Sequence, residues 1–362
     1  MTSLHEPLEF ASGARMKNRF MLAPLTNCQS HDDGSLSDEE FRWLTLRAEG
    51  GFGLVMTCAT HVQARGRGFP GQLALYDDRH VAPLARLAEA IKARGSLAVV
   101  QLHHAGVRSP AELIGEAPVG PSDHAGHGAR GLTLGEVEQA AADFVAAALR
   151  AERAGFDGVE LHGAHGYLLA QFLSEEYNRR TDRYGGSLEN RSRLLFEILQ
   201  AIRAQCRPGF LLGVRLSPER FGLRLDEMRA VAGRLLAEGR LDLLDLSLWD
   251  VRKLPEEPAA AGRSLLSYFT ELPRGATRIG IAGKVATAAD ARHCLEAGAD
   301  LAIVGRAAIL HHDFPERVRA DARFEPVELP VTPDYLRSEG LSPPFIRYLG
   351  NWKGFVAETA PA

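Results

Sequence analysis

Three segments of this chain repeat one local pattern: RAEGGFGLVMTCA, AERAGFDGVELHG and CLEAGADLAIVGR. Each segment reads as the end of a helix, a glycine, a short linker and an apolar run. A glycine directly after a helix adopts the left-handed conformation that closes the last turn at little steric cost. The apolar run behind it is typical of a parallel strand that is buried on both faces. A fourth, weaker copy is AEGRLDLLDLSLW. The repeat therefore predicts a parallel α/β fold.

Apolar runs of this kind occur eight times, at Phe20–Ala23, Leu54–Cys58, Leu97–Leu102, Gly158–Leu161, Leu211–Leu216, Leu243–Leu248, Arg278–Ala282 and Leu301–Val304. Helical patterns alternate with them, and Ser37, Thr133 and Thr287 each precede one as an N-cap with an acidic residue three positions later. Eight strands alternating with helices predict a single (β/α)8 TIM barrel. An open sheet is less favoured, because no glycine-rich dinucleotide fingerprint follows the first strand. No linker divides the chain, so we expect one domain over residues 1–362.

The two ends of the chain and one long connection add further expectations. The N-terminal LEFASGARMKN alternates around Ser12-Gly13 and predicts a β-hairpin that caps the barrel floor. The connection Gly106–Arg130 is rich in glycine, proline and histidine, and loops of that length inside a compact domain are usually functional. The C-terminal part, 326–362, carries five spaced aromatic residues. We expect it to pack over the barrel or against another subunit, which leaves a homo-oligomer open.

Bulk composition excludes several classes of function. A formal charge of −4 without a Lys/Arg block gives no basis for a nucleic-acid partner. No apolar run reaches the ~18 residues of a membrane helix, and the N-terminus lacks a signal-peptide core. The four cysteines are scattered without a C-x-x-C pair, which disfavours a zinc knuckle, a redox dithiol or an iron–sulfur cluster. We therefore expect a cytoplasmic protein with no membrane or nucleic-acid partner and no bound metal.

Residues at the carboxyl ends of the predicted strands form a common set, because barrel enzymes gather their reactive groups there. Glycines after the seventh and eighth strands let backbone N–H groups approach an anion, and Arg306 adds a charged fork. The set fits a flat, polar, phosphorylated heterocycle. From these residues alone, simple strand–helix turns and an internal network of Gln101 with Arg215 stay open as alternatives. The members are Ala23, Pro24, Leu25, Thr26, Ala59, Thr60, Gln101, His162, His165, Arg215, Gly283, Lys284, Gly305 and Arg306.

The run that follows the fourth predicted strand, HGAHGYLLAQFLSEEYNRRTDRYGGSLENR, is the most specific motif of the chain. It places His162, His165 and Tyr167 within six positions. Imidazoles can hold a carbonyl-type oxygen, and a phenol can deliver a proton. The run resembles the old yellow enzyme family of flavin-dependent ene-reductases, whose signature is H-x-x-H/N-x-Y followed by N-x-R-x-D-x-Y-G-G-S-x-x-N-R.

This resemblance covers essentially the whole chain and implies a non-covalent FMN. It implies that Gln101 binds the pyrimidine edge of the flavin and that Arg215 stabilises the negative charge near N1 and O2 of the reduced ring. Thr26 would donate its hydroxyl toward O4. The phosphate would be bound by Gly283, Lys284, Gly305 and Arg306, and the remaining cofactor contacts would come from Ala23, Pro24, Leu25 and Ala59.

The resemblance also implies the reaction. NADPH or NADH would reduce the flavin and leave, and an α,β-unsaturated carbonyl or nitro compound would take its place. His162 and His165 would hold the activating oxygen, while hydride passes from flavin N5 to the β-carbon and Tyr167 protonates the α-carbon. Larger relatives add an iron–sulfur cluster and nucleotide-binding domains. Because this chain lacks clustered cysteines and ends soon after the barrel, we expect electrons to come directly from the nicotinamide.

Two other enzyme classes remain open at this point. One is a metal-dependent barrel hydrolase or lyase in which His162 and His165 are ligands. The other is a phosphate-ligand barrel without redox activity, such as an isomerase. The two histidines can also be purely structural.

Some positions depart from the family pattern. His103 and His104 follow Gln101-Leu102 where at most one histidine is expected, and His103 is then placed to face the pocket. His312 occupies a position that is usually proline. Thr26 is typical of one branch of the family, whereas a histidine pair is typical of another. The branch, the physiological substrate and the choice of NADPH or NADH stay undetermined by the sequence.

Overall fold

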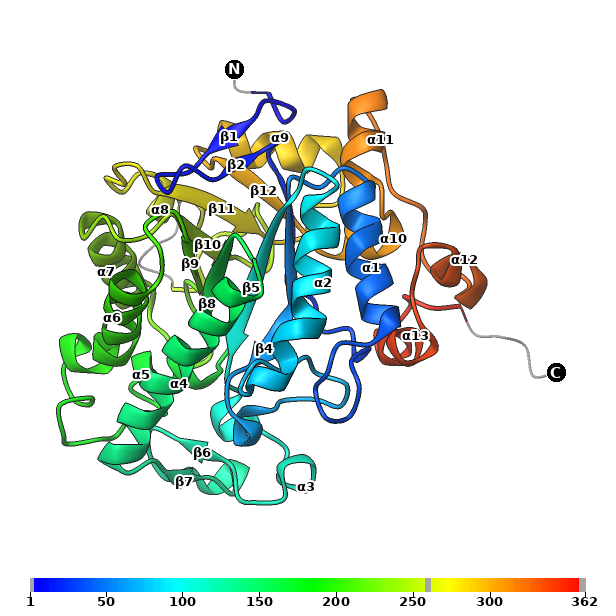
Figure 1. Ribbon diagram of the computed structural model, residues 1–362. Coiled ribbons are helices and arrows are strands. Elements are labelled where there is room, and N and C mark those ends of the chain that lie inside the picture. The colour runs from blue at the N-terminus through cyan, green and yellow to red at the C-terminus, as the bar shows by residue number, and fades with distance from the viewer. Residues whose placement is uncertain (1–2, 258–261, 358–362) are drawn as a thin grey trace.

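Eight parallel strands form a closed barrel, in the order β3-β4-β5-β8-β9-β10-β11-β12 around the ring (Figure 1). The computed structural model describes residues 3–257 and 262–357, so the parts of the expected domain at 1–2, 258–261 and 358–362 lie outside the described residues. The barrel confirms the predicted (β/α)8 fold. Its strands are β3 (Phe20–Leu22), β4 (Leu54–His61), β5 (Leu97–His103), β8 (Gly158–Gly163), β9 (Leu211–Leu216), β10 (Leu243–Ser247), β11 (Arg278–Ala282) and β12 (Leu301–Val304).

The longer helices pack their apolar faces on the outside of this ring, and the predicted caps begin three of them. Ser37 accepts a hydrogen bond from the backbone N–H of Glu40, and Thr133 and Thr287 form reciprocal capping boxes. The helices are α1 (Asp38–Glu49), α2 (Val81–Lys92), α3 (Ala111–Ile114), α4 (Leu134–Arg153), α5 (Leu168–Leu173), α6 (Leu188–Gln205), α7 (Leu225–Ala237), α8 (Ser267–Thr270), α9 (Ala288–Glu296), α10 (Arg306–Leu310), α11 (Phe314–Ala320), α12 (Pro333–Ser338) and α13 (Pro343–Gly350). In the described part of the chain, no helix combines the length and apolar character needed to cross a membrane.

The predicted N-terminal hairpin closes one end of the barrel. Its strands β1 (Leu8–Glu9) and β2 (Arg15–Met16) pair antiparallel. Leu8, Phe10 and Met16 are buried and pack in one cluster with apolar side chains of the barrel strands. Figure 1 shows the hairpin at the opposite end from the loops that follow the strands. In the described part of the chain, the end of the barrel opposite the hairpin is therefore the open one.

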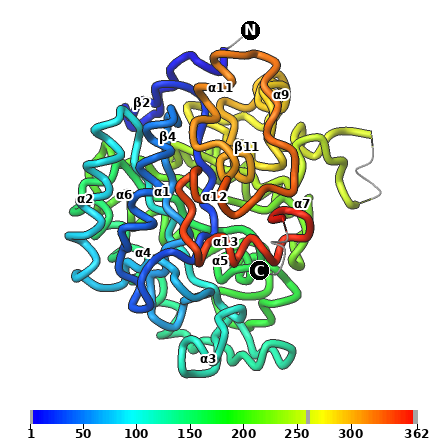
Figure 2. Tube along the Cα trace, turned by 90° about the vertical axis from the view of Figure 1, so that its right-hand side faces the viewer, coloured from blue at the N-terminus to red at the C-terminus, as the bar shows by residue number. Residues whose placement is uncertain are grey.

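The C-terminal segment packs over the barrel wall beside α1. The ring of Phe345 on α13 meets Trp43 of α1 edge to face, with centroids 5.6 Å apart. Arg47 of α1 is fully buried and donates hydrogen bonds to the backbone carbonyls of Ala308 and Glu339. Figure 2 shows α12 and α13 lying across this side of the molecule. The segment thus brings α13 toward the loops at the open end of the barrel.

The second half of the signature run folds on itself and is structural. Asn178 donates to the carbonyls of Phe172 and Tyr184, at 2.7 and 2.8 Å. A Cβ at Gly185 would lie 2.1 Å from the carbonyl oxygen of Arg180, so only glycine fits there. Arg180 in turn donates 2.8 Å to the carbonyl of Pro121 in the long connection after β5. The run therefore anchors the loop that borders the open end. That loop contains η3 (Gly106–Arg108), α3, β6 (Val119–Gly120), η4 (Ala125–His127) and β7 (Arg130–Gly131).

Candidate active site

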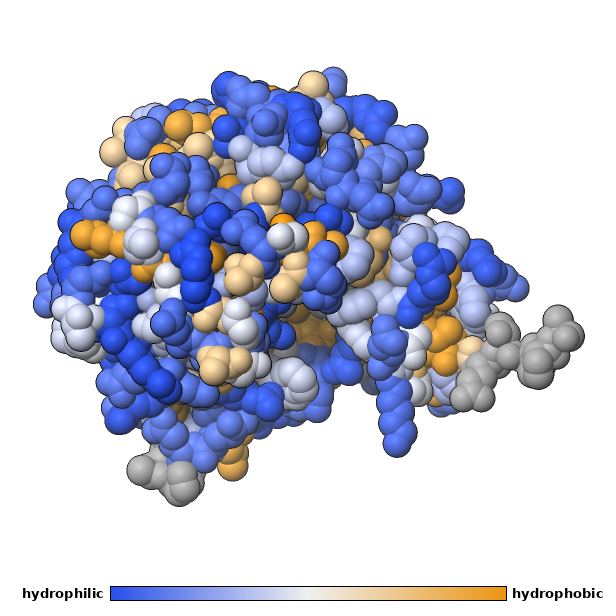
Figure 3. Space-filling model, turned by 90° about the horizontal axis from the view of Figure 1, so that it is seen from below, coloured by the Kyte–Doolittle hydropathy of each residue, from blue (hydrophilic) through white to orange (hydrophobic). Residues whose placement is uncertain are grey.

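The strand-end residues predicted from sequence come together at the open end of the barrel. Figure 3 views the molecule from this end and shows a hollow near its centre. Parallel strands in a closed barrel point the same way, so residues that end different strands meet around one axis. Register brings His162 of β8 opposite Arg215 of β9, and Ala59 of β4 opposite Gln101 of β5.

His162, His165 and Tyr167 form one cluster after β8. The ring centroids of the two histidines are 5.0 Å apart, and those of His162 and Tyr167 are 5.1 Å apart. His162 Nε2 and His165 Nδ1 are within hydrogen-bond distance, 3.1 Å, and His165 Nε2 lies 2.8 Å from Ser247 Oγ at the end of β10. His165 has a left-handed backbone, φ 58°, which costs energy for a residue with a side chain. The two imidazoles thus lie in contact with each other at the end of β8.

The histidines of this cluster are neutral. Burial lowers the pKa of His162 and of His165 well below 6.5, and the charge of Arg215 lowers both further. Each neutral imidazole has one N–H donor and one acceptor. Nδ1 of His162 is buried and has no partner among the described residues. Each ring therefore has a single N–H to offer an incoming oxygen, and the contact between His162 Nε2 and His165 Nδ1 must open for both rings to donate to it.

His103 joins this cluster, and its tautomer is fixed. Gln72 Oε1 accepts from the Gly68 N–H at 2.6 Å, and Gln72 Nε2 donates to the Ala59 carbonyl at 2.6 Å. The second N–H of the Gln72 amide points at His103 Nδ1, 3.1 Å away. An amide nitrogen cannot accept, so Nδ1 must be the acceptor and the proton of neutral His103 sits on Nε2.

The Nε2 atom of His103 is buried and finds no partner in the described part of the chain. Its ring packs edge to face on Tyr167, with centroids 4.5 Å apart, and on His162 at 5.4 Å. His104, by contrast, accepts from the Gly106 N–H and faces Gln63, outside the cluster. The first of the two unusual histidines therefore belongs to the site, and the second supports the loop.

Sequence reasoning missed the acidic half of the site. Glu160 and Asp245 are fully buried in β8 and β10, two positions before His162 and Ser247. Residues two apart in a strand share a face, so both carboxyls line the interior beneath the strand ends. Glu160 Oε1 accepts from Gln101 Nε2 at 2.8 Å. Asp245 Oδ2 lies 3.0 Å from Arg215 Nε, close enough for an ion pair although not aligned as a hydrogen bond.

This interior network favours one protonated and one ionised carboxyl group. Burial, and then the neighbouring Asp245, raise the pKa of Glu160, while Arg215 opposes the rise. Burial also raises the pKa of Asp245, but by less than that of Glu160, and the positive charge of Arg215 opposes the rise. We infer that Glu160 is the neutral member and Asp245 the ionised partner of Arg215. A carboxylate inside an apolar strand, as in GVEL and LLDLS, is the signal that would have revealed both.

The predicted phosphate residues lie side by side after β11 and β12. Arg306 is exposed and has no ion pair or hydrogen bond within the described residues. A Cβ added at Gly305 would meet only Leu25 and Ala23, at 3.6 and 3.8 Å, so the space over Gly305 is open. Lys284 is already paired with Asp250, at 3.0 Å. Arg306 is therefore the free cation of this patch.

The loop after β3 supplies the remaining predicted contacts. Ala23 is buried and bonds through its N–H to the Val304 carbonyl, and Pro24, Leu25 and Thr26 are half-exposed beside it. Tyr348 of α13 lies next to Thr26, and burial raises the pKa of Tyr348. The sequence did not predict this contribution from the C-terminal segment.

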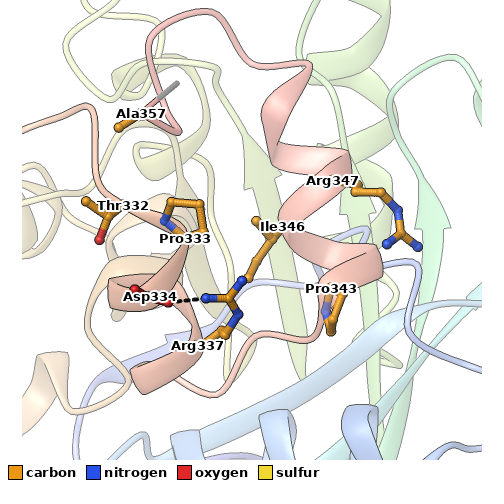
Figure 4. Close-up of a pocket in the computed structure, with 8 residues that line it drawn as sticks. All are labelled: Thr332, Pro333, Asp334, Arg337, Pro343, Ile346, Arg347 and Ala357. Carbon is orange, nitrogen blue, oxygen red and sulfur yellow. Dashed lines mark hydrogen bonds and ion pairs between the residues drawn. The ribbon is translucent and has the colours of Figure 1, made fainter. Parts of the chain in front are cut away.

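A separate cavity lies elsewhere and holds none of these groups. It has a volume of about 630 Å³ and lies between α12 and α13, lined by residues such as Pro333, Ile346 and Arg347. Figure 4 shows Arg337 paired with Asp334, which lies one turn away on the same helix α12. No predicted site residue borders it, so it is separate from the strand-end site.

The strand-end residues fit FMN. The amide of Gln101 and the guanidinium of Arg215 lie on one side of the site. The open backbone at Gly305 and the unpaired Arg306 lie on the other side, and the neutral imidazoles lie between them. Among residues 3–257 and 262–357, no three His, Cys, Asp or Glu side chains are grouped to hold a metal ion. The arrangement is that of a flavin-dependent barrel oxidoreductase.

Comparison with known proteins also indicates a flavin-dependent oxidoreductase. The model of the NADH:flavin oxidoreductase / NADH oxidase family matches residues 3–324. The chain is 36% identical to the probable NADH-dependent flavin oxidoreductase YqiG of Bacillus subtilis, over 98% of this chain and 97% of that protein. It is 34% identical to an NADPH dehydrogenase of Listeria innocua, over 87% and 94% of the two chains.

A solved structure of the old yellow enzyme homologue from Zymomonas mobilis superposes with a TM-score of 0.80 at 27% identity, covering 92% of this chain and 96% of that one. The protein belongs to the old yellow enzyme family of FMN-dependent NAD(P)H oxidoreductases. This confirms the predicted family, enzyme class and cofactor. The two non-redox alternatives are not supported.

Proposed function

We propose that the protein is an ene-reductase, which reduces the C=C bond of α,β-unsaturated carbonyl or nitro compounds. The observation that carries the proposal is the cluster of His162, His165 and Tyr167 at one strand end, with both imidazoles neutral. When bound, FMN supplies hydride after it has been reduced by NADPH or NADH.

The chain's own residues perform the rest of the reaction. His162 and His165 donate hydrogen bonds to the activating oxygen of the alkene and stabilise the negative charge that develops there. Tyr167 gives its phenolic proton to the α-carbon and regains one from solvent. The hydride on the β-carbon and the proton on the α-carbon complete the reduction of the C=C bond.

Cofactor contacts follow from the same geometry. Gln101 keeps one Nε2 hydrogen for Glu160 and has a second hydrogen and Oε1 for the flavin pyrimidine edge. Arg215 offers positive charge where the reduced ring is negative, and Thr26 offers a hydroxyl. Arg306 and the open backbone at Gly305 bind the phosphate together with Gly283 and Lys284, and Ala23, Pro24, Leu25 and Ala59 complete the cradle.

The test separates substrate binding from flavin binding. His165→Ala should slow reduction of cyclohexenone by roughly 10²-fold or more, as the loss of a preorganised donor does elsewhere. It should also weaken binding of a simple phenol, measured by its charge-transfer absorbance with the oxidised flavin. His31→Ala, which removes an exposed imidazole, serves as the control. Unchanged phenol affinity in both His162→Ala and His165→Ala would refute the oxygen clamp.

A further inference from the structure

Arg108 stands at the rim of the cluster and contacts two of its residues. It ends η3, after β5, and its Nη1 donates to the backbone carbonyl of His165 at 2.5 Å. Its guanidinium carbon lies 4.7 Å from the centre of the Tyr167 ring. The side chain thus reaches from the loop after β5 to the loop after β8. Its charge is held beside the groups that meet the substrate.

This charge has no carboxylate partner in the described part of the chain. Its neighbours on the same side of the molecule are matched: Arg65 pairs with Glu116 at 3.1 Å, and Arg180 pairs with Asp182 at 2.6 Å. Arg108 itself is exposed, so an incoming ligand can reach the donors that the His165 carbonyl leaves free.

No negative group of the site faces Arg108. Besides the Tyr167 phenol, imidazoles feel its charge: burial lowers the pKa of His103, of His162 and of His165, and the charge of Arg108 lowers each further. The two carboxyls of the site, Glu160 and Asp245, lie two strand positions deeper and are fully buried. The other charges beside His165 are matched, Lys253 with Glu219 at 2.6 Å and Arg220 with Glu256 at 3.6 Å, so among the described residues Arg108 brings an unpaired positive charge to the rim.

We propose that Arg108 is a specificity-determining residue that makes the pocket selective for activated alkenes carrying a second, anionic group such as a carboxylate. This inference rests on the proposed ene-reductase function. A guanidinium matches a carboxylate with two parallel N–H donors, which a lysine cannot do. The carboxylate itself is unchanged in the reaction, so hydride and proton still go to the two alkene carbons.

A matched pair of substrates isolates this charge. Trans-4-oxo-2-pentenoic acid and its methyl ester share one enone and differ in one negative charge. We expect kcat/KM for the acid relative to the ester to fall roughly tenfold in Arg108→Gln, the size of a hydrogen bond to a charged group. Arg108→Lys should restore part of the ratio. The wild-type ratio should fall as salt is raised, because exposed charges are screened.

Binding provides a second readout. The dissociation constants of p-hydroxybenzoate and methyl p-hydroxybenzoate, measured by flavin charge-transfer absorbance, should show the same change in ratio. Arg65→Gln removes a nearby arginine that already has a carboxylate partner, and it should leave both ratios unaltered.

Three outcomes would overturn the inference. An unchanged ratio in Arg108→Gln would show that no anion meets this side chain, and equal loss for acid and ester would reduce it to a support for His165 and Tyr167. A rise confined to the KM for NADPH would assign the charge to the phosphates of the nicotinamide. If the wild type reduced neither enone, the ene-reductase proposal would fail, whereas the phenol titrations would still decide the role of Arg108.

Discussion

Acid should destabilise this protein steeply, and His104 gives a way to measure why. His104 is buried, accepts the Gly106 N–H on Nδ1 at 2.9 Å, and lies 3.0 Å from Gln63 Oε1 through Nε2. A second proton on Nδ1 would break the Gly106 bond and place a charge in the interior. Burial, aided by the charges of His61 and Arg65, lowers the pKa of His104 from 6.5 to about 3.

The sign and size follow from linkage. Because the folded pKa of His104 is the lower one, the unfolded chain takes up a proton first, and stability is lost as the pH falls below 6.5. One pKa unit is worth about 1.36 kcal/mol, so the interval from 6.5 down to pH 5 costs about 2 kcal/mol. His61, whose pKa burial lowers to about 4, costs the same by pH 5. Burial lowers the pKa of His103, His162 and His165 in the same direction. Acid sensitivity is therefore shared among five buried imidazoles, of which His104 is the one that can be replaced outside the cluster.

Urea unfolding of the wild type and His104→Gln, followed by tryptophan fluorescence at a fixed FMN excess, tests this account. At pH 7.5 the variant should be less stable by about 1–2 kcal/mol, since it leaves the Gly106 N–H without an acceptor. Between pH 7.5 and 5.0 the wild type should lose about 2 kcal/mol more than the variant. His31→Gln, at an exposed position, should behave as wild type. Equal losses in wild type and His104→Gln would refute the argument.

Three further outcomes are expected. Tyr167→Phe should leave flavin reduction by NADPH nearly unchanged in stopped flow and slow cyclohexenone reduction by ~10²–10⁴-fold, the range of general acid catalysis; equal slowing of both half-reactions would contradict a proton-donor role. Arg306→Ala should weaken FMN binding by about 1.5–3 kcal/mol in a fluorescence titration, whereas Arg15→Ala, in the hairpin at the other end of the barrel, should not. Glu160→Gln should retain FMN affinity, because burial raises the pKa of Glu160 and keeps this side chain neutral. Glu160→Leu should weaken FMN binding, because it leaves Gln101 without a hydrogen-bond acceptor. A larger loss of affinity in Glu160→Gln than in Glu160→Leu would mean that a charged Glu160 is required.

Strands were predictable here because each is an apolar run buried on both faces. The eight predicted runs start at the observed first residues, and the differences lie at the carboxyl ends. Strand β4 was expected to stop at Cys58 but continues to His61, because its backbone pairs with β5 through Ala59, Thr60 and His61. The functional side chains of the site are polar residues at these strand ends. A strand predicted from its apolar residues alone therefore ends before it includes them.

Which side chains meet was harder to predict, because the contacts that fix them join distant positions. Gln72 and His103 are separated by 31 residues, and neither lies in a motif that names the other. Tyr348 reaches the site from a C-terminal helix whose amphipathic pattern indicates packing but not a partner. Strand-end position and the signature run indicated the set of residues, whereas tautomers, ion pairs and the acidic interior required the folded geometry.

The charged groups of the site lie at two depths. Their positions explain why the imidazoles of His162 and His165 need to be neutral. Beneath the strand ends, Asp245 balances Arg215 and Glu160 holds a proton. At the rim, Arg108 is unbalanced. A protonated His162 or His165 between these two guanidiniums would be repelled from both sides, which is the electrostatic part of their lowered pKa values. Neutral donors avoid that repulsion and still hold an oxygen as it becomes negative, so the clamp should keep one protonation state from pH 6 to pH 8. An acid limb in the rate profile of enone reduction over that interval would therefore come from another group, such as the Glu160–Asp245 pair, the substrate or the flavin.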